Sequence, residues 1–156
     1  SIINNVELIT PIYKCILPKI ESRWITGFID AEGCFSCSIL SNHHVNYRVR
    51  FILTQKWNIN KYVLEHILSL FNFHYGFNTN LGIITPHSVE NVWELRINGL
   101  KNCIKLSKYF KDYPLKSKKN ISFNKFIYIL NKIENKEHLD KKLRHNIKLL
   151  SKDLNK

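Results

Sequence analysis

Apolar residues along the first third of the chain change their spacing. Within residues 21–32 they recur every three or four positions, as on one side of a helix. Over 34–40 and 47–54 they alternate with polar residues, which is typical of strands that bury one face. The short connection over 41–46 makes these two strands an antiparallel hairpin. The pattern therefore predicts a helix that leads directly into a hairpin.

The rest of the chain repeats this order and then becomes helical. Asn60 and Asn98 are predicted N-caps, because each precedes a helical apolar pattern. After the hairpin we predict, in order, a helix from Asn60 to Phe71, strands over 76–80 and 92–97, a helix from Asn98 to Phe110, a helix around 123–133 and a basic helix around 139–154. The heptad-like spacing of leucines in the last helix is read as a C-terminal cover rather than a coiled coil. Residues 1–20 have no clear period and form a predicted arm, and 21–156 form one α+β domain.

Charge restricts the class of partner. The chain has 156 residues, with 24 Lys plus Arg against 12 Asp plus Glu, so its net charge is +12. That excess favours a polyanion, above all a nucleic acid, although charge alone leaves ribosome association or simple solubility open. No apolar run approaches the roughly 20 residues that span a bilayer, so no membrane partner is expected.

The four cysteines do not predict a metal centre. Cys34 and Cys37 form one C-x-x-C near two histidines, which is a partial zinc pattern. In a strand, however, residues three apart point to opposite faces. We therefore expect no zinc, and we expect reduced thiols rather than a disulfide framework.

Two acidic residues close the first helix in the string W-I-T-G-F-I-D-A-E-G-C-F. Asp30 and Glu32 place negative charge where the helix dipole is also negative, which costs about 0.3–1 kcal/mol per charge unless a cation offsets it. Gly27 and Ala31, four residues apart, leave a neighbouring face of the helix without bulky side chains. A second helix could therefore pack on that face backbone to backbone.

The string from Ile25 to Gly33 resembles the signature of the LAGLIDADG homing endonucleases. It departs from the consensus at Ile25, Thr26, Phe28 and Glu32, and only Glu32 touches the chemistry, where it keeps a carboxylate. The resemblance spans about 23–130 and includes one signature with no second copy. It implies a curved four-stranded antiparallel sheet that forms a saddle over DNA, backed by helices. It also implies a homodimer that cuts both strands of a long, nearly palindromic site.

The same resemblance assigns roles to individual residues. Glu32 and the carbonyl of Ala31 would hold a divalent metal ion, Mg²⁺ or Mn²⁺. Gln55 matches a position that orients water, and Lys118 matches a basic residue near the scissile phosphate, with Lys116 as a rival. The dimer interface would comprise Trp24, Gly27, Phe28, Asp30 and Ala31.

Alternation also predicts which residues read DNA. One face of the sheet must cover the core, and the other is free to enter a major groove, which admits a two-stranded ribbon. The predicted DNA contacts are Ser36, Ser38, Leu40, Asn42, Arg48, Arg50, Ile52, Thr54, Lys56, Glu94, Arg96 and Lys116. Arginine suits guanine edges, and serine and threonine suit several bases.

Two other functions remain open at this point. The same fold could assist splicing as an RNA maturase that binds its own intron, or it could regulate DNA without cutting it. The abundance of Ile, Asn and Lys matches A/T-rich codons, which favours an organellar and most simply a mitochondrial gene. The residues before Pro18 lack the character of a transit peptide.

Overall fold

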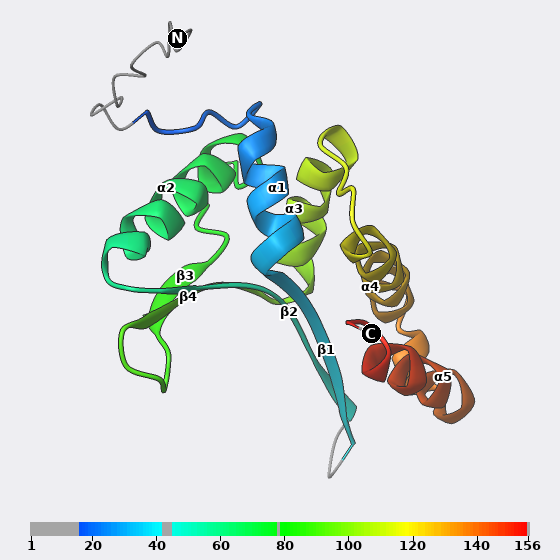
Figure 1. Cartoon of the computed structure of the whole chain (residues 1–156). Coiled ribbons are helices and arrows are strands. Elements are labelled where there is room, and N and C mark those ends of the chain that lie inside the picture. The colour runs from blue at the N-terminus through cyan, green and yellow to red at the C-terminus, as the bar shows by residue number, and fades with distance from the viewer. Residues whose placement is uncertain (1–15, 42–44, 78, 156) are drawn as a thin grey trace, which may run out of the picture.

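The computed structural model describes residues 16–41, 45–77 and 79–155. Its elements are α1 (Arg23–Glu32), β1 (Gly33–Ser41), β2 (Val45–Lys56), α2 (Ile59–His74), β3 (Ile83–Pro86), β4 (Val92–Asn98), α3 (Leu100–Asp112), α4 (Lys119–Glu134), the short 3₁₀ helix η1 (Glu137–Leu139) and α5 (Lys141–Lys152). The strands form one antiparallel sheet in the order β1-β2-β4-β3. Figure 1 shows β1 and β2 curving together, with the helices gathered on one side of the sheet. The predicted α+β fold is confirmed.

The core forms between the sheet and the helices that cover it. Phe35 of β1 lies at its centre, with its ring centroid 5.6 Å from that of Phe51, 5.7 Å from Phe110, 5.5 Å from Phe123 and 5.2 Å from Phe126. These rings come from β1, β2, α3 and α4, so burial of one aromatic cluster joins four elements. The helices are thereby fixed to one face of the sheet, and the other face is left without a cover of its own.

Gly33 allows α1 to run into β1 without a loop. It has an extended backbone, φ −69° and ψ 149°, and its N–H donates to the carbonyl of Ile29. A Cβ at this position would lie 2.7 Å from the oxygen of Ile29 and 2.8 Å from its Cγ2, so only glycine permits the approach. The end of α1 is therefore held tightly against the first strand.

Both predicted asparagine caps were wrong by one or two residues. Helix α2 begins at Ile59 because Trp57 takes a positive φ of 76° and turns the chain early, and Asn60 instead donates from Nδ2 to the carbonyl of Lys56 at 2.8 Å. Helix α3 follows Gly99, whose φ of 87° suits glycine, while Asn98 is the last residue of β4.

The strand predicted over 76–80 was also wrong. Gly76 ends the turn after α2, where its N–H donates to the carbonyls of Phe71 and Asn72 at 3.0 and 3.1 Å. Thr79 N–H then bonds back to the Gly76 carbonyl at 3.0 Å, which closes a tight turn. The third strand is instead 83–86, in the segment predicted to be a connection.

The helix predicted around 139–154 is divided into η1 and α5, and only part of its apolar stripe covers the core. Ile147 of α5 and Leu154 beyond its end are buried, whereas Leu139 of η1 and Leu143 of α5 are exposed by 54% and 40%. Residues 1–15 and Asn42 lie outside the described part of the chain, so the N-terminal arm and its boundary stay a prediction. No helix in the described ranges is long and apolar enough to cross a membrane.

Candidate nucleic-acid interface

The polar residues of the sheet share its uncovered face. Cross-strand pairs join Ser36 to Arg50, Ser38 to Arg48, Leu40 to Asn46, Ile52 to Arg96 and Thr54 to Glu94. The intervening positions are the buried ones: Phe35, Cys37, Ile39, Val49, Phe51, Leu53, Leu95 and Ile97. Alternation therefore predicted correctly which side chains stand on the face opposite the helices. Lys56, the exposed last residue of β2, pairs with Val92.

Three arginines crowd together on this face. The pKa of Arg50 is lowered first by its partial burial and then by the neighbouring charges of Arg48 and Arg96, while Glu94 opposes the shift. Like charges held this close favour an anion among them. The face is thus suited to phosphates and to the acceptor-rich edges of guanine bases.

Glu94 stands on this face, yet it does not offer a free carboxylate. It is 7% exposed and accepts hydrogen bonds from the guanidinium of Arg96, and His87 Nε2 lies 3.4 Å from its Oε1. Thr85, paired with Glu94 across the strands, keeps its hydroxyl buried without a hydrogen-bond partner in the described structure. We therefore expect Glu94 to orient Arg96 rather than to contact a base itself.

Glu32 lies where the helix face meets the sheet. It is the last residue of α1, it is exposed, and no described residue forms an ion pair with it. Figure 1 shows this end of α1 above the start of β1, at the middle of the molecule. A carboxylate in this place is open to a ligand that approaches along the sheet.

Lys119 is the residue that sequence reasoning missed. Its ammonium donates to the carbonyl of Ala31 at 3.4 Å and to that of Gly33. It offsets the dipole of the α1 C-terminus, where the two acidic residues concentrate negative charge. Lys118, one residue earlier, is exposed at the N-cap of α4 and, with Lys119, borders a cavity beside Gly33. The K-S-K-K run contains both lysines, and the role expected of Lys118 stays a prediction beside the contacts of Lys119.

Asp30 holds the segment that carries this lysine. Its carboxylate accepts from the N–H of Lys116 at 2.7 Å, from the N–H of Ser117 at 3.3 Å and from the Ser117 hydroxyl at 2.7 Å. Both oxygens are therefore used inside the chain. Asp30 fixes the segment that leads into α4. These hydrogen bonds alone can account for a carboxylate at this position, and its predicted contact with a second helix stays a prediction. Lys116 contributes only its backbone N–H to this contact, and its side chain is exposed.

Gln55 lies level with the end of α1. Gly33 pairs with Leu53, so Gln55 is two residues beyond that pair, on the side of the helix terminus. Asn60 Nδ2 is 3.5 Å from the Gln55 side-chain oxygen. This contact, at the long limit of a hydrogen bond, directs the amide oxygen toward α2.

The oxygen donors fit a hard divalent cation better than zinc. Mg²⁺ keeps several waters and uses one or two carboxylates with substrate phosphates, so a carboxylate and the Ala31 carbonyl are a suitable partial set. The described residues contain no cluster of three His, Cys, Asp or Glu side chains that could hold a metal alone. Cys37 faces the core, and burial raises the pKa of its thiol to about 12, whereas Cys34 stands on the other face. The two thiols do not form a zinc half-site.

The outer side of α1 differs from its core side. Ile25 and Ile29 are fully buried, whereas Trp24 is 47% exposed and stacks on Phe28 with ring centroids 4.9 Å apart. A Cβ added to Gly27 would meet no atom within 4 Å. Trp24, Gly27, Phe28 and Ala31 thus form an outward surface, which we call the α1 outer face.

Comparisons with known proteins agree with this geometry. The family model for LAGLIDADG endonucleases matches residues 25–130. Over 148 residues the chain is 32% identical to a probable intron-encoded endonuclease 4 of Neurospora crassa, covering 86% of this chain and 23% of that protein. The other curated relatives, from Podospora anserina and Dictyostelium citrinum, are covered over 30% and 44% of their length. The chain therefore spans less than half of the curated relatives it matches.

Solved structures show the same fold. The crystal structure of a homing endonuclease, I-TnaI, superposes with a TM-score of 0.76 at 28% identity and covers 90% of both chains. The LAGLIDADG meganuclease I-AabMI bound to uncleaved DNA gives a TM-score of 0.72 at 30% identity, over 86% of this chain and 44% of that one. Because the family model matches most of the sequence and includes the α1–β1 junction, this chain belongs to the LAGLIDADG endonuclease family.

Proposed function

We propose that this chain is a DNA-cleaving half that acts with a second, similar half as a metal-dependent, site-specific double-strand endonuclease. The observation that carries the proposal is the position of Glu32, an exposed carboxylate where the α1 outer face meets the arginine-bearing face of the sheet. An exposed carboxylate repels a polyanion, so a protein that only bound DNA would gain nothing from one at this place.

A bound Mg²⁺ or Mn²⁺ would activate water and offset the charge that develops on the phosphate. Glu32 and the Ala31 carbonyl are the ligands we propose for it. Lys119, whose ammonium lies 3.4 Å from the same carbonyl, would neutralise the phosphate beside the ion, and Gln55 would orient the attacking water. As the water oxygen bonds to phosphorus and gives up a proton to solvent, the bond to the leaving strand breaks and the oxygen of that strand takes a proton from solvent. Asp30 acts indirectly, because it fixes the segment that carries Lys119.

We propose a homodimer formed through the α1 outer face, because one chain supplies one Glu32 and two strands need one each. Coverage of 90% of I-TnaI supports a single-motif arrangement for this chain. Coverage of about half of I-AabMI supports the alternative in which a similar half is joined in one chain. With nine residues at roughly 3.3 Å each, β1 spans about nine base pairs, so two halves and a short centre predict a target of roughly 20 base pairs.

Names of relatives such as the probable intron-encoded endonuclease support an intron-encoded origin for this chain too, with a mitochondrial genome as the location we propose. A maturase that binds intron RNA remains the second candidate on that same observation.

The direct test incubates the protein with a randomised library of near-palindromic duplexes and Mg²⁺, then sequences the cut ends. We expect one family of related sites of about 20 base pairs to be enriched. Intact DNA throughout, with tight binding to intron RNA, would instead favour the maturase.

Lys119 should matter more for cleavage than Lys118. We expect Lys119→Met to lower the cleavage rate by about 10²-fold or more, because it removes a charge held at the Ala31 carbonyl. Lys118→Met, which removes the same charge from the preceding residue, should lower the cleavage rate by less than about 10-fold. Single-turnover cleavage under saturating DNA measures both rates. Equal losses in the two variants would contradict the assignment of Lys119.

Arg50 should contribute to base preference. Arg50→Ala should cost about 1–3 kcal/mol at the base pair it contacts and relax preference there, since arginine pairs with a guanine edge in two places. Lys101→Ala, at an exposed position on α3, serves as a control. It should change the affinity for every DNA sequence by the same factor. Binding profiles over all single-base variants of the target measure this. A uniform loss in the Arg50 variant would contradict base reading by the sheet.

A further inference from the structure

Helix α5 carries a line of basic side chains that the proposed function does not use. Lys141, Lys148 and Lys152, with His145 between them, recur at helical spacing and so share one side of α5. We call these four residues the lysine stripe. The buried side of the helix is elsewhere, at Ile147. The helix contains no acidic residue between Lys141 and Lys152.

Arg144 plays a different part. Its Nη1 donates to the carbonyls of His138 and Leu139 at 3.2 and 3.0 Å, so it anchors the start of α5 to η1. The stripe and this anchor therefore have separate roles, and the stripe can be altered without touching the anchor.

Helix α5 lies along the free edge of the sheet. β1 is an edge strand, and Asn155 Nδ2 donates to the Phe35 carbonyl near its inner end at 2.8 Å. Near its outer end the ring of His138 packs against Tyr47 at 5.2 Å, and Tyr47 pairs with Ile39 of β1. The segment from His138 to Asn155, which contains α5, thus runs in the opposite sense to β1, and Figure 1 shows α5 beside the outer part of the strand.

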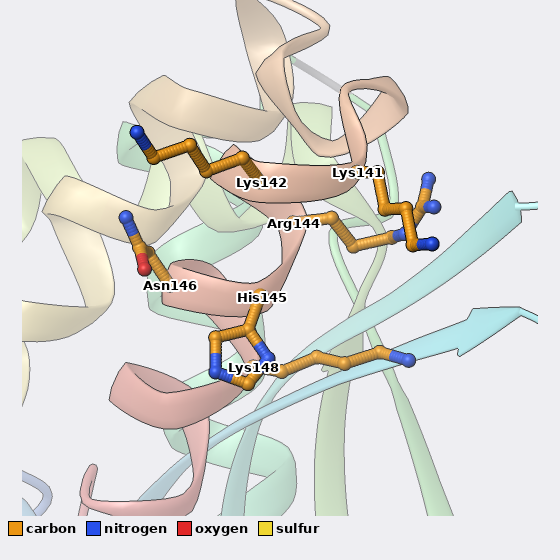
Figure 2. Close-up of a pocket in the computed structure, with 6 residues that line it drawn as sticks. All are labelled: Lys141, Lys142, Arg144, His145, Asn146 and Lys148. Atoms are coloured by element: carbon orange, nitrogen blue, oxygen red, sulfur yellow. The ribbon is translucent and has the colours of Figure 1, made fainter.

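The stripe is turned toward the strands. Figure 2 shows Lys141 and Lys148 reaching to the side on which the two strands run, while Lys142 and Asn146 point the other way. The same residues line an open groove on α5. Cations therefore follow the sheet edge outward from Lys119, which contacts the first residue of β1.

The length of the stripe matches a stretch of nucleic-acid backbone. Lys141 and Lys152 are eleven residues apart, or about 16 Å along the helix. One DNA strand carries a phosphate every 3.4 Å of axis, so the stripe faces about five phosphates. A ribbon in the major groove is bordered by the two backbones, and α5 stands where one of them would pass beside β1.

We propose that the lysine stripe binds the phosphate backbone of the target along the β1 edge, outward from the cleavage centre. It would hold the DNA in register without reading its sequence. This inference rests on the proposed function, since it assumes that the sheet face is the one that enters DNA.

The test compares two DNA lengths and two variants of equal charge. The stripe variant is Lys141→Gln, Lys148→Gln and Lys152→Gln, and the control is Lys101→Gln, Lys108→Gln and Lys111→Gln, at exposed positions on α3. Glutamine keeps helix propensity, so both should fold. Each is titrated, over a range of salt, onto the full target and onto a target that lacks the outer four base pairs of each half.

On the full target we expect the stripe variant to bind at least about 10-fold more weakly than wild type, with a log–log salt slope shallower by up to about 2.7 for three lost contacts. On the short target its deficit should shrink to less than about threefold, whereas the control should lose the same factor on both lengths. A length-independent loss in the stripe variant would overturn the proposal. So would unchanged DNA binding with weaker binding to a structured RNA, which would assign the stripe to RNA. If the wild type did not cut DNA, that would count against the proposed function. The comparison of binding between the stripe variant and the control would still test the stripe.

Discussion

Replacing Glu32 by glutamine should abolish cleavage and leave DNA binding near the wild-type level. The substitution keeps the size of the side chain and removes the charge that we propose binds the metal ion. Because Glu32 is exposed and no ion pair with another described residue is lost, the fold should not change. We expect the single-turnover rate to fall by at least about 10²–10³-fold, the cost of losing one group that stabilises transition-state charge. Binding, measured by anisotropy, should change less than about threefold.

Glu32→Asp is the matched control. It restores the residue of the family signature and keeps the carboxylate, so cleavage should persist at a reduced rate. Calcium should support binding by the wild type without turnover, because Ca²⁺ takes more ligands in a looser geometry than Mg²⁺. Cutting by Glu32→Gln at the wild-type rate would remove this residue from the mechanism.

The sequence predicted the faces of the sheet better than the boundaries of its elements. Alternation between Arg48 and Thr54 gives the orientation of every side chain once one residue of the strand is known to be buried. Boundaries depend instead on local backbone angles. The start of α2 is set by the positive φ of Trp57, which no pattern of hydrophobicity encodes. The third strand was missed because its four residues are too few for a period to emerge.

The candidate site was predictable where one motif contains it and not where it joins distant segments. Glu32 and Ala31 followed from the signature alone. Lys119 is 87 positions from Glu32 along the chain, and its approach depends on Asp30, which binds the backbone of Lys116 and Ser117. This contact can be identified only from the folded structure. The lysines of K-S-K-K are alike in sequence, and the start of α4 determines which of them reaches the end of α1.

Gly27→Leu should separate folding from assembly. Within the chain the new Cβ meets no atom within 4 Å, and leucine is a better helix former than glycine, which is about 0.8–1 kcal/mol less favourable than alanine. The isolated chain should therefore fold with an unchanged far-UV circular dichroism spectrum. Against a second α1 the same side chain would enlarge a surface shaped by Gly27 and Ala31. Overpacking costs about 1–3 kcal/mol, and a two-fold axis applies it twice. The dissociation constant of the dimer should then rise by roughly 30-fold to 10⁴-fold.

Cleavage should be lost together with the dimer, because each strand needs its own Glu32. Sedimentation equilibrium gives the assembly state, and cleavage at matched concentrations gives the activity. Gly27→Ala, which adds only the methyl group, should show a smaller shift in the same direction. If wild-type protein cut both strands as a monomer, or if Gly27→Leu remained an active dimer, the α1 outer face would not be the surface that joins two halves. A nearly palindromic target would then no longer be expected, because the symmetry of the site follows from the symmetry of this contact.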